Sequence, residues 1–454
     1  MRRPQLALSL TAAFAVLLPA PLALASDGVL EINQVCAVQT GCFVGDTAGF
    51  PVTVTQGGSY RLTGNLDLSA LPATHGIVLN ARHVTLDLAG FEIVGASTCT
   101  GSGSSLSCTG GGGEGISLQA TALGATVLNG TVRNMGGNGV GGFAEMVRIE
   151  GITAMHNGAD GISGQVESII RNSMSRENQN DGFDVDGGTV IENCTAFGNG
   201  SDGIELDGQG AVVRGSTTRG NGGAGINAVG RSTVSDVVSR DNAAEGVLLG
   251  DDSIAERVVA IGNTGEGIEA GLGSVVRGSV SAGNGSIGIV ASFGSGIHTS
   301  TGRANASVGI VGGKSSVVGN SAANNGFHGI SGNGVVAFNT SSENAPHGII
   351  GGGVIIGNAA LSNDADGINA SAAVIVNNLA HGNGAGNFDA GIDIGSGGLV
   401  KGNTANFNTG DGIDCNTGGD VAIRENEVNG NTLVSVNGCT DLGGNACNGV
   451  ASCP

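Results

Sequence analysis

A six-residue segment, Asn-x-x-x-Gly followed by Ile, Val or Phe, recurs thirteen times in the chain. Its glycines run from Gly161 to Gly412, and successive glycines lie 19 to 24 residues apart, most often 21. A period between about 20 and 50 residues indicates a solenoid or an array of stacked units. The spacing therefore predicts one repeat architecture over most of the chain.

Each unit alternates apolar and polar residues on both sides of a turn, as residues 182–186 and 189–193 illustrate. Alternation with period two predicts short, half-buried strands. Several strands and no helical period exclude a leucine-rich horseshoe and a helical solenoid. We therefore predict a parallel β-helix, in which each strand pairs with its equivalent in the next coil about 4.8 Å away.

The recurring Asn and Gly are expected to serve this scaffold. A side-chain amide at a turn can bond the equivalent Asn in the coils above and below, which forms a ladder. The Gly supplies either a positive φ or a close backbone approach. On both interpretations, replacing Gly246 by Val destabilises the stack.

The chain divides into four expected regions. Residues 1–25, with Arg2, Arg3 and the apolar run Leu6–Leu18, are typical of a secretory signal peptide. Residues 26–75 are expected to cap the first coils, residues 76–428 to form the β-helix and residues 429–454 to form a Cys-rich cap. We expect roughly 16 coils and a rod of about 75–80 Å. No later apolar stretch is long enough to span a membrane, so we expect a secreted or periplasmic protein, and a monomer.

Nine Cys in an exported chain predict disulfides and one leftover thiol. We expect pairs Cys36–Cys42 and Cys99–Cys108. Two more pairs are expected among Cys415, Cys439, Cys447 and Cys453, with their partners left open. Cys194, alone within the repeats, is expected to be buried as a small apolar residue.

The Asn and Gly repeat, its period and the segment Val84–Phe91 resemble the pectate-lyase-like superfamily of right-handed parallel β-helix repeat proteins. The resemblance covers most of residues 75–428 and implies an all-β, right-handed parallel β-helix. That superfamily hosts lyases, polygalacturonases, uronate epimerases, metal-handling proteins and non-catalytic surface proteins, so it does not define an activity. The Tyr and His of the epimerase motif are absent from Asp181–Asp186, and no His accompanies Asp251 and Asp252. We therefore transfer no catalytic residue.

Charge and composition exclude several partners. The chain has 18 basic and 38 acidic residues and a net charge of −20, which argues against nucleic acid and favours cations. It has no Trp and one Tyr, so the aromatic platform common in sugar-binding sites is missing. No nucleotide-binding loop or zinc Cys/His set is present, so no organic cofactor is implied.

The candidate site lies in two acidic segments one coil apart, Asp181–Asp186 and Asp202–Asp207. If the apolar residues between the acids point inward, the acids point outward in columns about 5 Å apart. A further column, which begins at Asp160, lies at the preceding turn. Carboxylates crowded in this way require a cation or a raised pKa, and hard oxygen ligands suit Ca²⁺.

Two residue sets follow from this arrangement. The expected Ca²⁺ ligands are Asp181, Asp184, Asp202 and Glu205. The expected contacts to a polysaccharide are Asp184, Asp186, Glu205, Asp207, Arg171 and Arg214, since paired carboxylates serve sugar chemistry and Arg can hold a uronate. The alternative is a solvated acidic face without a ligand.

His328 and His347 precede Gly in successive units and are expected to stack about 5 Å apart at an exposed turn. Such a pair could bind copper or zinc, or form only a polar turn. The function expected overall is engagement of an extracellular or envelope polysaccharide, with Ca²⁺ as a possible aid and catalysis left open. The alternative is a non-catalytic structural or surface-interaction protein, favoured by coils of almost constant length.

Overall fold

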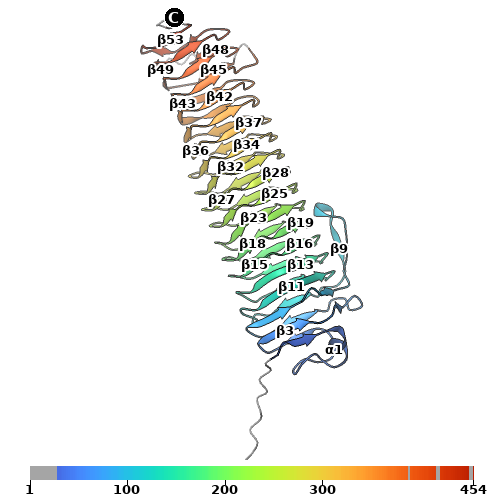
Figure 1. Ribbon diagram of the computed structural model, residues 1–454. Coiled ribbons are helices and arrows are strands. Elements are labelled where there is room, and N and C mark those ends of the chain that lie inside the picture. The colour runs from blue at the N-terminus through green and yellow to red at the C-terminus, as the bar shows by residue number, and fades with distance from the viewer. Residues whose placement is uncertain (1–27, 387–388, 416–419, 449–452, 454) are drawn as a thin grey trace, which may run out of the picture.

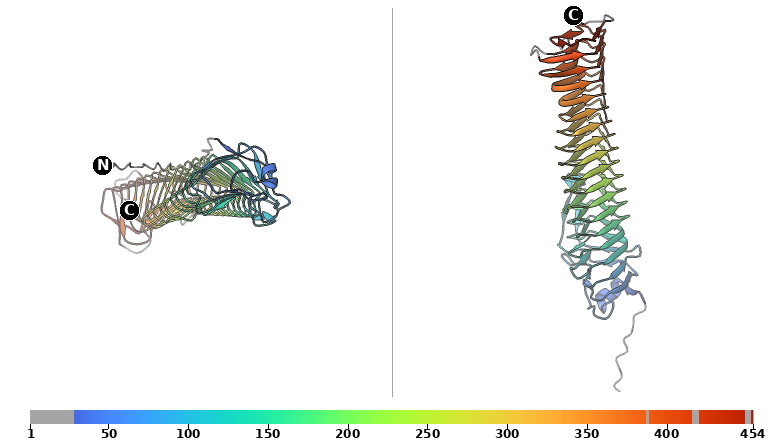
Figure 2. Two further views of the ribbon diagram at one scale, coloured as in Figure 1. Left: turned by 90° about the horizontal axis from the view of Figure 1, so that it is seen from below. Right: turned by 90° about the vertical axis from the view of Figure 1, so that its left-hand side faces the viewer.

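The chain winds into one elongated solenoid, described by a computed structural model over residues 28–386, 389–415, 420–448 and 453. The expected signal peptide lies outside the described residues. Figure 1 shows the coils succeeding one another from one end of the rod to the other, and Figure 2 shows the same continuous stack from two other sides. The fold is the predicted right-handed parallel β-helix.

Three parallel ladders, here called sheets 1, 2 and 3, run along the rod, and each coil contributes one strand to each. Sheet 1 contains β2 Val52–Val54, β5 Ile77–Leu79, β10 Ile116–Leu118, β12 Val140–Gly142, β14 Ile162–Gly164, β17 Phe183–Val185, β20 Ile204–Leu206, β23 Ile226–Ala228, β26 Val247–Leu249, β29 Ile268–Ala270, β32 Ile289–Ala291, β35 Ile310–Gly312, β38 Ile330–Gly332, β45 Ala390–Ile394, β48 Asp411–Asp414 and β51 Val436–Asn437. Sheet 2 contains β1 Leu30–Ile32, β3 Gly58–Leu62, β6 Val84–Asp87, β15 Ile169–Arg171, β18 Val190–Glu192, β21 Val212–Arg214, β24 Thr233–Ser235, β27 Ile254–Glu256, β30 Val275–Arg277, β33 Gly296–His298, β36 Ser316–Val318, β39 Val335–Ala337, β46 Gly398–Lys401, β49 Val421–Arg424 and β52 Thr440–Asp441.

Sheet 3 follows in the same way, and four longer strands belong to two sheets each. Sheet 3 contains β4 Leu66–Asp67, β7 Glu92–Val94, β16 Met174–Arg176, β19 Thr195–Phe197, β22 Thr217–Arg219, β25 Val238–Arg240, β28 Val259–Ile261, β31 Val280–Ala282, β34 Thr301–Arg303, β37 Ser321–Ala323, β40 Thr340–Ser342, β42 Ala359–Leu361, β44 Leu379–His381, β47 Thr404–Asn406, β50 Glu427–Asn429 and β53 Ala446–Cys447. The strands β11 Thr126–Arg133 and β13 Arg148–Met155 span sheets 2 and 3, whereas β41 Ile349–Ile356 and β43 Ile368–Val376 span sheets 1 and 2.

The number of coils is larger than expected. Sheet 2 has 19 rungs, from β1 to β52, instead of roughly 16 coils, which corresponds to a rod of about 90 Å. The difference arises because parallel pairing begins at β1 and β2 and continues through β53, inside both regions expected to act only as caps.

The strands bury alternate residues, so the three sheets expose different numbers of side chains. In sheet 1, Phe183 and Val185 are buried and only the central residue faces outward. In sheet 2, the central Ile191 is buried and the two flanking residues face outward. Sheet 1 therefore presents a single outward column.

The expected Asn ladder is present. Asn178 Oδ1 accepts bonds from the backbone N–H and the Nδ2 of Asn157, at 3.1 and 2.9 Å, and the pattern continues to Asn431. In the 24-residue coil the ladder residue is Asn383, because four residues are inserted after it. Asn387, which the repeat spacing selects, lies outside the described residues.

A second ladder lies at the turn between sheets 2 and 3, and it explains Cys194. From Asn320 onward this turn also carries an Asn in each coil, whereas earlier coils carry mainly Ser. Cys194 occupies this column, and its backbone N–H donates to Ser216 Oγ at 3.1 Å. The thiol is buried, as expected.

The repeat glycines act through close approach and not through a positive φ. A Cβ on Gly246 would lie 2.5 Å from the carbonyl oxygen of Gly267 and 2.6 Å from Asn263 Nδ2. The left-handed residues lie instead at the three corners of each coil, as at Glu167, Asn172 and Glu177.

Both ends of the rod carry disulfides. The helix α1 Gln34–Gln39 lies at the first coil, where Cys36 is bonded to Cys42. At the other end the four Cys pair as Cys415–Cys439 and Cys447–Cys453, which settles the open pairing. Cys99–Cys108 is also formed as expected. The described helices include none long and apolar enough to cross a membrane.

Candidate functional site

The acidic segments form neighbouring outward columns on and beside sheet 1. Asp184 on β17 and Glu205 on β20 occupy equivalent central positions and pair in register. Asp186 and Asp207 follow these strands at equivalent positions, since their backbone N–H groups bond the preceding coil in the same way. These four acids thus face outward, as the alternation of apolar and polar residues predicts.

The column at the preceding turn is buried and has a structural role. Asp181 and Asp202 are 7% and 9% exposed. The backbone N–H groups of Asp181, Asp202 and Ala224 donate to the side chain one coil back, as Asp181 N–H does to Asp160 Oδ1 at 3.2 Å. Asn138 Oδ1 accepts from Asp160 N–H in the same way at 3.0 Å. In these coils the side chain therefore acts as a hydrogen-bond acceptor, and a negative charge is not necessary for that role.

Three of the four expected metal ligands come together. Asp181, Asp202 and Glu205 each offer one carboxylate oxygen, and these oxygens all lie within 4.8 Å of one another. Two oxygens on opposite sides of a Ca²⁺ ion lie at most about 5 Å apart, so the spacing fits this ion. The fourth expected ligand, Asp184, lies outside this set.

Burial and mutual repulsion raise the pKa of Glu205 and of Asp184. For Glu205, burial and then the charge of Asp181, with which it also shares a hydrogen bond, raise the pKa to about 8. For Asp184, burial and then the charges of Asp160 and Asp207 raise the pKa to about 7. Without a cation, Asp184 and Glu205 therefore hold protons near neutral pH.

A second acidic cluster, not anticipated from the sequence, lies further along the same face. Glu245, Glu266 and Glu269 offer oxygens that also lie within 4.8 Å of one another. Burial and then the charges of Glu266 and Glu245 raise the pKa of Glu269. The sequence contained the signal for this cluster. Glu245 and Glu266 directly precede the repeat Gly, as Asp202 does, and Glu269 lies two residues after it, as Glu205 does.

The structure does not bring Arg171 and Arg214 to the acidic columns. Both lie on sheet 2, on β15 and β21, and both form ion pairs of 2.9 Å with Glu192 on the strand between them. The sequence suggested proximity because they are close along the chain, but a turn separates sheet 2 from sheet 1.

The two sheets treat charge in opposite ways. On sheet 2 the outward column alternates sign, from Glu150 to Arg171, Glu192 and Arg214, and again from Glu256 to Arg277. On sheet 1 of the same coils, Asp184 lies directly beside Glu205. Like charges at adjacent rungs are destabilising unless a proton or a cation compensates for them.

One element projects from the otherwise even coils and lies beside this acidic face. The arm is a disulfide-linked hairpin of β8 Thr98–Thr100 and β9 Ser107–Thr109, joined by the short η1 Gly103–Ser105. It runs along the rod past β16 and β19 (Figure 1).

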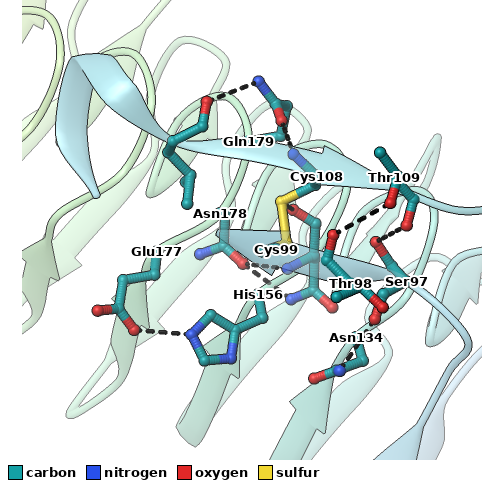
Figure 3. Close-up of a disulfide and its surroundings, with 12 residues drawn as sticks. Ser97, Thr98, Cys99, Cys108, Thr109, Asn134, His156, Glu177, Asn178 and Gln179 are labelled. Carbon is teal, nitrogen blue, oxygen red and sulfur yellow. Dashed lines mark hydrogen bonds and ion pairs between the residues drawn. A yellow bond between two sulfur atoms is a disulfide. The ribbon is translucent and has the colours of Figure 1, made fainter. Parts of the chain in front are cut away.

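The arm is held to the turn that leads into sheet 1. Cys108 N–H donates to Gln179 Oε1, and Gln179 Nε2 donates to the carbonyl of Leu106 at 3.4 Å (Figure 3). Gly103 N–H donates to the carbonyl of Gly198 at 2.9 Å. Gln179 lies two residues before Asp181, so the arm borders the acidic columns on one side.

The two histidines stack as the sequence predicted, but both are half-buried and not exposed. The ring centroids of His328 and His347 lie 5.1 Å apart in a stacked arrangement. Burial and then the charge of His347 lower the pKa of His328 to about 4, so its ring is neutral at physiological pH. His347 Nδ1 accepts a bond from the backbone N–H of Asp366 at 3.2 Å, which gives this ring the same ladder role as the Asp column.

Comparisons with known proteins agree with this architecture at the level of the family model. Residues 89–243 match the model of the right handed beta helix region. No curated protein matches the sequence.

Solved structures with related coils have low similarity scores. One is the A-module of mannuronan C-5 epimerase AlgE4 from Azotobacter vinelandii, at 15% identity and a TM-score of 0.31, covering 85% of this chain and 88% of that one. Another is the periplasmic alginate epimerase AlgG, in a double-mutant form, at 13% identity and 0.28, covering 72% and 77%. A third is a double mutant of the tailspike protein of E. coli bacteriophage HK620, at 14% identity and 0.27, covering 87% and 71%.

Proposed function

We propose that this chain, a right-handed parallel β-helix repeat protein, binds an extracellular or envelope polysaccharide along the outer face of sheet 1, with Ca²⁺ as a bridging ion. The observation that carries the proposal is the contrast between adjacent sheets. Sheet 2 pairs Glu150, Glu192 and Glu256 with Arg, whereas sheet 1 stacks Asp184 and Glu205 without a basic partner in the outward column. On sheet 2 of the same coils, neighbouring charges have opposite signs. The unpaired acidic stack on sheet 1 therefore supports a bound cation that compensates its charge.

Asp181, Asp202 and Glu205 are the residues that would hold the ion. Ca²⁺ takes about six to eight oxygen ligands, so three carboxylates leave several positions open. Those positions suit sugar hydroxyls or a uronate carboxylate, which the acidic protein would otherwise repel. Bound Ca²⁺ supplies charge compensation and bridging.

The remaining outward acids would contact sugar hydroxyls directly. Asp184, Asp186 and Asp207 offer acceptor oxygens beside the proposed ion site, and the coils repeat them at the rung spacing of about 4.8 Å. An extended polysaccharide presents its sugars as a similarly regular series. The four disulfides are typical of proteins that fold in an oxidising compartment, as expected for a secreted or periplasmic protein.

The test is calorimetric titration with Ca²⁺, followed by binding to uronic-acid and neutral polysaccharides with Ca²⁺ or EDTA. The triple variant Asp181→Asn, Asp202→Asn, Glu205→Gln should lose Ca²⁺ binding and Ca²⁺-dependent glycan binding. The control Glu192→Gln, Asp236→Asn, Glu256→Gln removes as many charges from or beside sheet 2 and should retain both. Unaltered Ca²⁺ affinity in the first variant would remove the ion from the proposal.

A second candidate is favoured by the even coils. From β14 to β38 the strands of all three sheets have three residues each, and no described loop walls the acidic face on the side away from the arm. This regularity suits a structural or surface-interaction protein without catalysis. Absence of binding to every glycan, with and without Ca²⁺, would favour it; new reducing ends or unsaturated uronate in the same incubations would instead reveal an enzyme.

A further inference from the structure

The repeat shortens at one place, and the shape of the rod changes there. The coils that begin at Gly329 and Gly348 have 19 residues instead of the usual 21. The coil that begins at Gly329 still has separate strands β38 and β39. In the next two coils, which begin at Gly348 and Gly367, the corner between sheets 1 and 2 is lost, because β41 and β43 run without interruption from one sheet into the other. These strands have eight and nine residues, whereas most others have three.

The outward columns of sheet 2 change character in the same coils. In the first half of the rod they carry the alternating charges of Glu192 and Arg214. From Val318 to Val376 in one column and from Val335 to Leu399 in the other they carry no charged residue and are mainly aliphatic; Lys401 follows Val376 on β46. The register stacks Val335, Val354, Val374 and Leu399 in one column and Val318, Ala337, Ile356 and Val376 in the other.

The column that begins at Val335 is mainly exposed although it is apolar, whereas the column that begins at Val318 is half-buried and its Ala337 is buried. Val335, Val354 and Val374 are 44%, 39% and 40% exposed, and Phe338 at the adjoining corner is 66% exposed. The lost corner itself carries only small residues, Gly351–Gly353 in β41 and residues 370–373 in β43. The result is a broad, level surface, here called the flat face, which consists of the outward residues of β39, β41 and β43 and of Leu399 on β46, with Lys401 at its edge.

The described elements leave the flat face uncovered. In Figure 1 the labels β36 and β43 stand along the left-hand side of the rod, whereas the arm with β9 lies on the right. The right-hand view of Figure 2 looks onto that left-hand side. An uncharged apolar surface of this extent on an acidic protein indicates an interaction site.

The area of the flat face favours a symmetrical partner. A strand of eight residues at about 3.3 Å each and four rungs at about 4.8 Å give roughly 500 Å². A specific interface buries at least about 1,000 Å² in total, which is reached when both partners contribute such a face. We propose that the flat face is the contact surface between two copies of this chain, in place of the monomer expected from sequence.

Period and charge both favour a second copy over another partner. Two identical solenoids have the same rung spacing, so their rows of Val and Ile can interdigitate along the whole face. Each chain has a net charge of −20, so the acidic parts of two chains repel each other. On the flat face, two chains can approach without bringing like charges together. The small area makes this a weak, concentration-dependent dimer. The proposal is independent of the glycan-binding face on sheet 1.

The experiment is sedimentation velocity of the mature chain in EDTA without glycan, from low to several hundred micromolar concentration. Wild type should shift from monomer to dimer. The double variant Ile356→Glu, Val376→Arg places a Glu and an Arg at neighbouring rungs of the flat face. The same column already holds such a pair in Glu192 and Arg214, so the variant should fold. Its dimer dissociation constant should rise about tenfold or more.

A matched control places the same charges elsewhere on sheet 2. Thr233 and Ile254 are neighbours in an outward column outside the flat face, and Thr233→Glu, Ile254→Arg should dimerise as wild type does. A wild-type chain that stays monomeric at every concentration overturns the proposal. The proposal is also overturned if the flat-face variant dimerises as strongly as wild type. It is likewise overturned if wild type never self-associates and the flat-face variant loses glycan binding.

Discussion

The Oδ1 atom of Asp181 accepts a hydrogen bond from the backbone N–H of Asp202, the equivalent residue one coil along, with 2.6 Å between the two atoms. The same carboxylate belongs to the cluster with Asp202 and Glu205. One side chain thus supports the scaffold and contributes to the acidic face. Substitutions that keep or remove the acceptor oxygen should separate these two roles.

Asp202 offers the clearest separation, because its Oδ1 accepts the buried backbone N–H of Ala224 at 2.6 Å. Asp202→Ala leaves that N–H without a partner and should lower the free energy of unfolding by about 1–3 kcal/mol. Asp202→Asn keeps an acceptor, as Asn138 does in the same column, and should cost much less. Thermal unfolding followed by circular dichroism in EDTA measures both; equal losses in the two variants would contradict the acceptor role.

The stability of the protein should fall as pH rises through neutrality when no cation is present. Asp184 and Glu205 have pKa values raised from 3.8 to about 7 and from 4.5 to about 8. Between the ordinary and the raised values the folded chain binds more protons than the unfolded chain, so the free energy of unfolding decreases with pH. The loss should begin above about pH 4 and level off above about pH 8.

The variant Asp184→Asn, Glu205→Gln isolates this contribution from that of the other acids. The difference in melting temperature between variant and wild type should grow in favour of the variant from acidic to mildly alkaline pH. Ca²⁺ should restore the wild type at the alkaline end, if the proposed ion site is correct. A difference that does not change with pH would show that these two groups titrate normally.

The sequence predicted what the repeat itself encodes. Period-two alternation placed Asp184 and Glu205 outward, and the recurring Asn gave the ladder, because both follow from local geometry. Arg171 and Arg214 were misplaced because nearness along the chain does not reveal which side of a turn a strand lies on. The acceptor role of Asp181 could have been inferred, since Asn138 precedes Gly at the equivalent position and shares only its oxygen with Asp.

Other features depended on contacts between coils. The recurring Gly was compatible with two explanations, a positive φ or a close approach of the backbone. Only the position of the next coil shows which of the two applies. The sequence contains two short spacings, but it does not show the flat face, because the merging of two strands at Gly351–Gly353 depends on how the neighbouring coils stack. Likewise, the number of coils depended on pairing at the ends, where the motif is absent.

Gly246 should not tolerate even Ala. A Cβ there would lie 2.5 Å from the Gly267 carbonyl oxygen and 2.6 Å from Asn263 Nδ2. The first atom belongs to the backbone pairing of sheet 1 and the second to the Asn ladder, so neither can move without the neighbouring coils. Gly246→Ala should reduce the free energy of unfolding by about 3 kcal/mol. Gly395 is the control, because its nearest contact would be 3.9 Å away and its φ is ordinary. Urea unfolding compares the two, and similar midpoints would argue against close approach.

The Cys194 thiol should be inert in the native protein. Burial raises its pKa to about 11, and its Sγ lies 3.4 Å from the carbonyl oxygen of Glu192. A thiol reagent should label no group in the folded chain and one group after unfolding without reduction. Cys194→Ser should fold normally, because Ser173 and Ser216 occupy the same column. Rapid labelling of the native chain would contradict burial.

Thr299 should be improved by substitution, because a β-branched residue occupies a left-handed corner there. Its φ is 48°, whereas the same corner of other coils holds Asn172, Asn193 and Asn377 at 50°, 54° and 55°. Asn tolerates this conformation and Thr does not, at a cost of about 1–2 kcal/mol. Thr299→Asn should therefore raise the melting temperature, corresponding to about 1 kcal/mol of added stability. Thr301→Asn, two residues on in the extended β34, should lower it because strands disfavour Asn. Opposite signs for the same replacement within one coil would locate the strain at the corner, whereas a loss in both variants would show that Thr299 is not strained.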